Sequence, residues 1–365
     1  MSKGSRIAGT ASTPSSTGVI AGAVLRACRE AIGGTQERFA ELVGVDLNTI
    51  KGWETGRRPL MNASGRTLLM LRRRLLQLGT PADLVQHLDT AMDADLFISN
   101  TIENGTEHSL LGDWVATRCW SDLLAWGLAG RTPDVISKHL GASARASLTP
   151  DVRSLFFEAL RRIADVTQGE SPDAMLLRRQ VYYMAAWDPE SEQWLASTER
   201  NELRQHGGRT NGWTPAWPLL RSIAVARACQ GDPTLLHDFI DNHLADDLCE
   251  AANLNYWSYW VEETTGIAGS DDFMAVDLGA QQGGTLLRHL AEGLESDVPY
   301  LPLSIHASCA LIQRRPALIM EDHELARRLG DQAAKLLDVS AGLPARTRRE
   351  LENIHFAAKM AAGPT

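Results

Sequence analysis

The sequence has no hydrophobic run long enough to cross a membrane. A helix that spans a bilayer needs about 20 consecutive, mainly apolar residues, and no stretch of the 365-residue chain comes near this length. Residues 1–17 also lack the apolar block of a signal peptide, and their Ser, Thr, Gly and Pro content is typical of a disordered arm. We therefore expect a cytoplasmic protein that has no membrane partner.

Cysteines and catalytic motifs are also scarce. The five cysteines are odd in number, widely separated and free of any CxxC pair: Cys28, Cys119, Cys229, Cys249 and Cys309. This pattern argues against a disulfide framework and a structural zinc site. The sequence contains no glycine-rich phosphate loop, GxSxG elbow or HExxH motif. We predict that the protein is not an enzyme and that it binds no cofactor.

Two His–Asp pairs at helical spacing are the nearest approach to a metal site. They are His237 with Asp241 and His243 with Asp247. The six residues between the two histidines turn a helix by about 600°, which places the pairs about 120° apart around its axis. Because the pairs do not converge, we predict a solvated acidic helix and no bound metal.

Charge is divided unevenly along the chain, whose net charge is −9. Residues 1–74 contain 12 Lys and Arg against 5 Asp and Glu, whereas the remaining residues contain 24 against 40. A basic head on an acidic body is expected when only the head approaches a polyanion.

The stretch TQERFAELVGVDLNTIKGWETGRRP, residues 35–59, predicts two short helices joined by a tight turn. Thr35 and Asp46 are good N-caps for QERFAELV and LNTIKGWE. Gly44 can adopt the positive φ of the turn, small Ala40 permits close packing, and Ile50 fills the corner between the helices. The spacing of four and then six residues between Ala40, Gly44 and Ile50 is the packing pattern of a helix-turn-helix.

These residues resemble the phage-repressor-type helix-turn-helix, also called the XRE family. The resemblance includes GVIAGAVLRACREAIG, TQERFAELVGV and the exit NTIKGWETGRRP, and it covers roughly residues 18–80. It implies a lambda-repressor-like domain whose second helix enters the major groove of double-stranded DNA. Two positions depart from the family pattern, because Leu47 stands where a polar base-reading residue is common and Gly52 lies inside the second helix.

The resemblance and the chemistry of the side chains predict seven DNA contacts. Leu47, Asn48 and Thr49 would meet base edges, with Asn48 able to pair bidentately with adenine and Leu47 to touch a thymine methyl group. The other contacts would go to phosphates and set the register of the protein on the duplex. These phosphate contacts are Gln36, by family resemblance, and Lys51, Arg57 and Arg58.

The rest of the chain has helical periodicity with no competing strand-like alternation, so we predict an all-α protein. We expect a helix-turn-helix domain at residues 18–80, a linker helix region at 81–106 and an α-helical regulatory and dimerisation domain at 107–365. The succession of short helices in this body is similar to tetratricopeptide-like stacking, although no fixed period emerges.

Aromatic residues are concentrated in the body. Two interpretations stay open for five of them, which either line a ligand pocket or pack the core and a dimer interface. The five are Trp213, Trp217, Tyr256, Trp257 and Trp260.

Two functions are consistent with this organisation. The first is a sequence-specific transcription regulator that acts as a homodimer on an operator with two half-sites, with a small-molecule effector or a protein partner bound to its body. The body resembles those of XRE-type regulators from high-GC bacteria, which implies control of development or secondary metabolism and a place on the nucleoid. The alternative is a helical protein-interaction scaffold, or an antitoxin-like factor, that the helix-turn-helix tethers to DNA.

Overall fold

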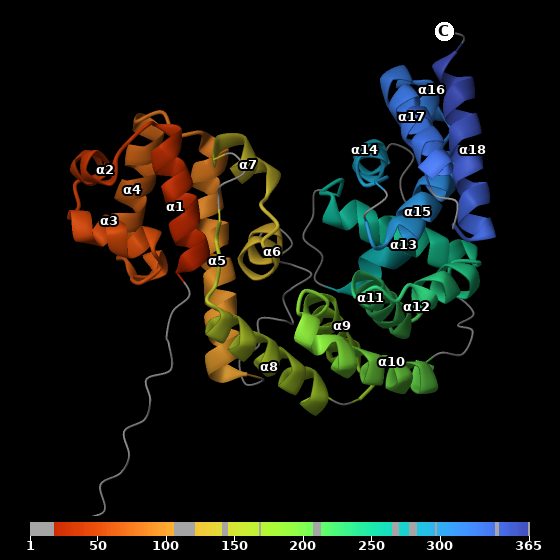
Figure 1. Ribbon diagram of the computed structural model, residues 1–365, viewed down its shortest axis with the longest axis horizontal. Helices are drawn as coiled ribbons and strands as arrows, with labels where there is room; N and C mark the ends of the chain where they lie inside the picture. Colours follow the sequence, from red (N-terminus) through yellow and green to blue (C-terminus); the bar gives the residue numbers. More distant parts are fainter. Residues whose placement is uncertain are drawn as a thin grey trace, which may run out of the picture. The chain divides into compact units, whose positions relative to one another are not determined.

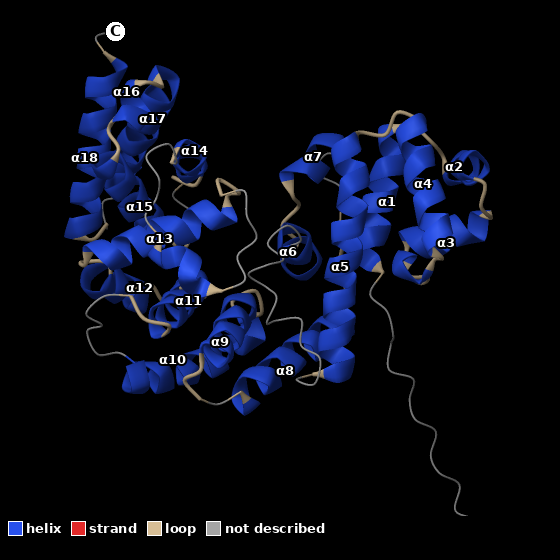
Figure 2. Ribbon diagram, turned by 180° about the vertical axis from the view of Figure 1, so that it is seen from behind, coloured by secondary structure: helices blue, strands red, loops and turns tan. Residues whose placement is uncertain are grey.

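The structure is a computed structural model, which describes residues 18–105, 121–140, 145–167, 169–206, 213–264, 270–276, 283–295, 298–339 and 343–363. Within these ranges the regular elements are helices, and there is no strand (Figures 1 and 2). The all-α prediction is therefore confirmed, as is the order of a helix-turn-helix followed by a helical body. No helix in these ranges is both long and apolar enough to span a membrane.

The described residues divide into two compact units. The N-terminal unit extends to Arg162, and the C-terminal unit begins at Ile163. The N-terminal unit contains α1 (Val19–Ala31), α2 (Gln36–Val43), α3 (Leu47–Glu54), the short 3₁₀ helix η1 (Leu60–Asn62), α4 (Gly65–Gln77), α5 (Ala82–Asn104), α6 (Ser121–Ala129), α7 (Asp134–Leu140) and most of α8 (Pro150–Val166).

Helix α1 lies at the centre of the N-terminal unit, where it contacts α3, α5, α6 and α7. Helix α5 runs beside α1 (Figure 1) and buries apolar residues that include Leu84, Leu88 and Phe97. We expected residues 81–106 to link two domains, but the packing of α5 on α1 makes this segment part of the same compact unit as the helix-turn-helix.

Asp95 on α5 caps the first turn of α1. The first N–H groups of a helix have no partner within it, and here the N-cap residue Gly18 supplies no side chain. The backbone N–H of Ile20 donates to Asp95 Oδ1 at 3.1 Å, and that of Ala21 donates to Oδ2 at 2.9 Å. The carboxylate therefore joins two helices that are far apart in the sequence, and it is 1% exposed.

The buried Asp95 predicts that the stability of the N-terminal unit falls as the pH rises. Burial raises the pKa of Asp95 from 3.8 to about 8, and the N–H groups of Ala21 and Ile20 lower it only in part. The folded state thus holds this proton more tightly than the unfolded chain, so the stabilisation is full below the unfolded pKa and is lost as the pH rises through the folded pKa. Between about pH 6 and pH 8 we expect a loss of about 2 kcal/mol from this group.

Urea unfolding of the parent protein and of Asp95→Asn at both pH values tests this expectation. Asparagine does not titrate, so the variant should lack this part of the pH dependence, while all other groups titrate in both proteins. An identical pH dependence in the two proteins would contradict a raised pKa at Asp95.

The C-terminal unit is a succession of packed helices that follows the end of α8. They are α9 (Pro172–Ala185), η4 (Pro189–Ser191), α10 (Glu192–His206), α11 (Ala216–Cys229), α12 (Thr234–Asp238), the π-helical turn η5 (Phe239–His243), α13 (Asp247–Trp260), η6 (Asp271–Ala275), α14 (Gly284–Glu292), α15 (Leu301–Arg314), α16 (Ala317–Met320), α17 (His323–Val339) and α18 (Ala345–Ala362). Helix α11 packs against α9, α10 and α12, and α17 packs against α18.

Candidate nucleic-acid interface

The turn between α2 and α3 is built by residues that act locally. Thr35 Oγ1 accepts a hydrogen bond from Arg38 N at 3.2 Å, and Asp46 Oδ1 accepts one from Asn48 N at 2.7 Å, so both expected N-caps are present. Gly44 ends α2 with φ 74°, in the left-handed region that favours glycine. Its N–H donates to Ala40 O at 2.9 Å. These contacts set the angle at which α3 leaves the turn.

The apolar residues of the motif form its core, and Ala40 and Ile50 pack as the spacing predicted. Phe39 and Ile50 are fully buried, and Ala40 and Trp53 are nearly so. Because these side chains face inward, the opposite side of α3 is left to solvent and to any ligand.

A buried carboxylate, Glu54, connects the three helices. Arg29 on α1 donates through Nε to Glu54 Oε1 at 2.6 Å and through Nη2 to Oε2 at 3.2 Å. Gln36 on α2 donates through Nε2 to Glu54 Oε2 at 2.7 Å. The Glu54 side chain is 0% exposed, so this network holds α1, α2 and α3 in one arrangement.

The role of Glu54 was not predicted, although the sequence contains a signal for it. Glu54 lies four residues after Ile50 and directly after Trp53, and residues four apart share a helix face. A carboxylate on the buried face of a short helix requires a cationic partner inside the fold. Arg29 meets that requirement from another helix.

The structure exposes four of the seven residues that were expected to contact DNA, and it leaves the others partly covered. The exposed residues are Asn48, Lys51, Arg57 and Arg58, and the half-buried ones are Gln36, Leu47 and Thr49.

Gln36 has a structural partner in the protein without DNA. Its amide nitrogen donates to Glu54, so the side chain helps to close the network that joins α2 to α3. The phosphate contact that family resemblance implies for Gln36 stays a prediction.

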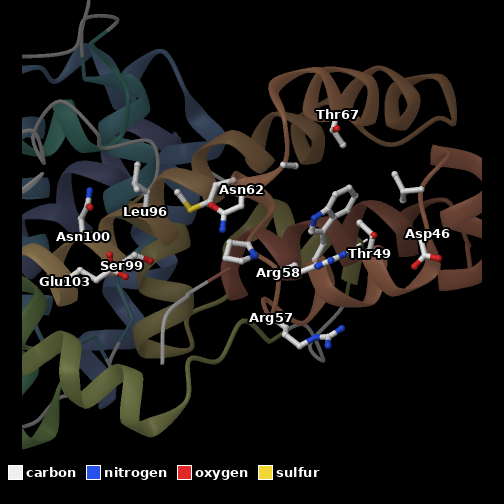
Figure 3. Close-up of a pocket in the computed structure, with 15 residues that line it drawn as sticks. Asp46, Thr49, Arg57, Arg58, Asn62, Thr67, Leu96, Ser99, Asn100 and Glu103 are labelled. Atoms are coloured by element: carbon white, nitrogen blue, oxygen red, sulfur yellow. Dashed lines mark hydrogen bonds between the residues drawn. The ribbon is translucent and has the colours of Figure 1, made fainter. Parts of the chain in front are cut away.

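A cleft of about 980 Å³ lies beside α3 (Figure 3). It is bordered by α3 and the residues on either side of it, by the first turn of α4 and by the last three turns of α5. The lining residues are Val45, Asp46, Thr49, Trp53, Arg57, Arg58, Pro59, Met61, Asn62, Ala63, Thr67, Leu96, Ser99, Asn100 and Glu103. The sequence did not indicate the α5 residues in this list, because residues 81–106 were expected to be a linker.

Gly52 has a packing role that explains its place inside the helix. The side chain of Arg58 folds back across α3, and its Nη1 donates to Thr49 Oγ1 at 3.3 Å (Figure 3). A Cβ atom on Gly52 would lie only 3.0 Å from Arg58 Cδ and 3.2 Å from Arg58 Cβ. Glycine thus costs helix propensity but lets a cationic side chain lie close to the start of α3.

The aromatic residues of the C-terminal unit do not share one environment. Trp217 is fully buried, and its indole N–H donates to His243 O at 3.0 Å, so it belongs to the core. Trp213, Tyr256, Trp257 and Trp260 are half-buried. Trp257 also packs against the hydrophobic core of the C-terminal unit, and ligand contact by these four residues stays a prediction.

The two His–Asp pairs lie in different surroundings. Asp241 Oδ1 accepts from Arg346 at 3.0 Å, and buried His243 stacks on Phe239. Within the part of the chain that the structure describes, no three His, Cys, Asp or Glu side chains gather in a way that could hold a metal ion.

A protein-family model described as helix-turn-helix matches residues 25–63. The matched segment runs from the second half of α1 through α2 and α3 to the end of η1. Comparison with curated proteins gave no match, and comparison with solved structures gave none either. The match supports a DNA-binding regulator of the XRE type, in agreement with the resemblance in the sequence.

Proposed function

We propose that this protein is a sequence-specific transcription regulator that binds an operator with two half-sites as a dimer. The observation that carries the proposal is a set of exposed polar and cationic side chains, Asn48 and Lys51 on α3 and Arg57 and Arg58 in the segment directly after it. The other side of α3 is fixed in the core. A single motif of this size makes few base contacts, and pairing across two half-sites supplies the additional specificity. The role of the chain in this proposal is binding and not catalysis.

The side chains on α3 and directly after it divide into those that can recognise bases and those that can bind phosphates. Asn48 lies in the first turn of α3, where an amide can accept from and donate to the edge of adenine in the major groove. Leu47 can contact a thymine methyl group beside it. Arg57, Arg58 and Lys51 carry charge that attracts phosphates without distinguishing sequence.

Two alanine variants distinguish a residue that recognises bases from one that binds phosphate. Asn48→Ala should cost about 1–3 kcal/mol on the operator and relax the preference at one base pair, because it removes a bidentate base contact. Arg57→Ala should weaken binding to all duplexes similarly and reduce the salt dependence of the affinity, because it removes a phosphate contact. Fluorescence anisotropy on operator and random duplexes over a range of salt concentrations measures both effects.

Arg327→Ala is the control for loss of charge alone, since Arg327 is an exposed cation on α17 in the C-terminal unit. It should change neither specificity nor the salt slope. Equal losses on operator and random DNA for Asn48→Ala would show that Asn48 does not read bases.

We further infer that the protein works in the cytoplasm on the nucleoid, and that an effector or a partner protein binds the C-terminal unit. Control of development or secondary metabolism is the process that the resemblance to regulators of high-GC bacteria implies. Genome-wide footprinting, combined with transcript levels after deletion, tests the proposal. Bound sites whose adjacent genes do not respond would instead favour a scaffold or an antitoxin-like factor tethered to DNA.

A further inference from the structure

Arg221 on α11 is a buried cation that lacks a counterion among the described residues. It is 5% exposed, and its Nε donates to Asn253 Oδ1 at 3.0 Å. That neutral amide is its hydrogen-bond partner in the described part of the chain, so Nη1 and Nη2 have none there. Buried charges in proteins are normally paired, which makes Arg221 an exception that requires an explanation.

Other buried arginines of the C-terminal unit follow the rule. Arg178 pairs with Glu202 at 3.1 Å, Arg227 pairs with Glu199 at 2.7 Å, and Arg179 makes two hydrogen bonds to the carboxylate of Asp271. Each of these three arginines thus has a carboxylate partner. Arg221 has no such partner among the described residues.

Aromatic rings and unpaired N–H groups surround this cation. The Cζ atom of Arg221 lies 4.2 Å from the ring centroid of Tyr256 and 5.2 Å from that of Trp257, at cation–π distance. Both rings are only half-buried. Asn253 Nδ2 and Trp257 Nε1 are buried and have no hydrogen-bond partner among the described residues. Two residues that contact Arg221 therefore also have buried N–H groups that lack a hydrogen-bond acceptor among the described residues.

The energetics favour an anion at this position. Burial lowers the pKa of Arg221, although the nearby tyrosines oppose the shift. A guanidinium nevertheless stays charged in proteins, because its ordinary pKa lies so high. Facing rings offset part of the cost of burying this charge, and an anion that bound the unpaired Nη groups would offset more.

We propose that Arg221 binds the carboxylate of a small organic ligand whose flat apolar part lies against Tyr256 and Trp257. One positive charge is available, because the charge of the neighbouring Arg179 is already neutralised by Asp271. A singly charged carboxylate balances it, whereas a phosphate dianion would bring an excess negative charge into a buried place. Carboxylate geometry also matches the two Nη groups of the guanidinium fork. Carboxylate binding by Arg221 does not rest on the proposed function, whereas a role of this ligand as the effector of a transcription regulator does.

Titration calorimetry on the full chain tests the site with matched probes. Benzoate and indole-3-acetate supply a carboxylate beside a flat ring, benzamide and indole-3-acetamide keep the shape without the charge, and inorganic phosphate supplies charge without the ring. We expect saturable binding of the carboxylates that is about tenfold or more tighter than binding of the amides or phosphate. Arg221→Met should remove this difference, and Arg221→Lys should weaken it, because lysine keeps the charge but not the fork.

The thermal stability of two variants gives an independent test. Arg221→Met should leave the melting temperature of the ligand-free protein unchanged or raise it, because the variant removes an unpaired buried charge. Arg179→Met should lower it, because Asp271 would lose its partner. A fall for Arg221→Met as large as that for Arg179→Met would show that Arg221 is structural and overturn the proposal.

Equal binding of benzoate and benzamide, unchanged benzoate binding in Arg221→Met and Arg221→Lys, or no binding of either carboxylate would also overturn it. Carboxylate binding in a protein that fails to bind any operator would support the Arg221 site while contradicting the proposed regulator function.

Discussion

Glu54→Ala should lose about 3–5 kcal/mol of the free energy of unfolding of the N-terminal unit, the cost typical of breaking a buried ion pair from one side. The substitution removes the buried carboxylate that Arg29 binds through two nitrogens. The Arg29 side chain, which is only 11% exposed, then keeps a single carboxylate partner among the described residues, the solvent-exposed Glu30 at 3.3 Å. It also removes the acceptor of the Gln36 amide. Because total stabilities of domains are of the order of 5–15 kcal/mol, much of the unit should be unfolded at moderate urea concentrations.

Glu41→Ala is the matched control. Glu41 also pairs with an arginine, Arg38 at 3.1 Å, but both side chains are about two-thirds exposed, at 69% and 65%. Exposed pairs contribute about 0–1 kcal/mol, so this variant should unfold nearly as the parent does. Urea titrations followed by circular dichroism compare the two variants. Similar unfolding midpoints would mean that burial does not determine how much the Glu54 network contributes to stability.

Gly22→Ala should destabilise the N-terminal unit about as much as Glu54→Ala does. This is the opposite of the usual result, in which alanine in place of a helical glycine raises stability. In an open helix interior, alanine in place of glycine stabilises by roughly 0.5–1 kcal/mol. At Gly22, however, a Cβ atom would lie 2.3 Å from Trp53 O and 2.9 Å from Glu54 O, and both of these atoms are backbone. Helix α1 would have to move away from the end of α3, and we expect a loss of about 3 kcal/mol or more from this overpacking.

Gly52→Ala provides the comparison, since Gly52 is also a buried helical glycine of the same unit. Its nearest obstacles are side-chain atoms of Arg58, at 3.0–3.3 Å, and an exposed arginine can move. Stability should change by no more than about 1 kcal/mol, while operator affinity falls because Arg58 is displaced from Thr49. A Gly22→Ala protein that is as stable as Gly52→Ala would show that α1 and α3 can separate without cost.

The sequence by itself determined the helix-turn-helix and the direction in which the apolar side chains of the motif face. Thr35, Gly44 and Asp46 act on backbone groups only two to four residues away, so their roles can be read from spacing alone. The inward direction of Phe39 and Ile50 follows from helical periodicity, and the exposure of Asn48 on the other side of α3 follows with it.

Tertiary structure alone decided which charges are buried and where the N-terminal unit ends. Glu54 accepts a hydrogen bond from Arg29, 25 positions away in the sequence, and Asp95 accepts one from Ala21, 74 positions away. Such partners depend on how helices cross, and a chain's local pattern does not encode the crossing. For the same reason the packing of α5 on α1 was not predicted. The burial of Arg221 without a carboxylate among the described residues likewise depends on how α11 packs.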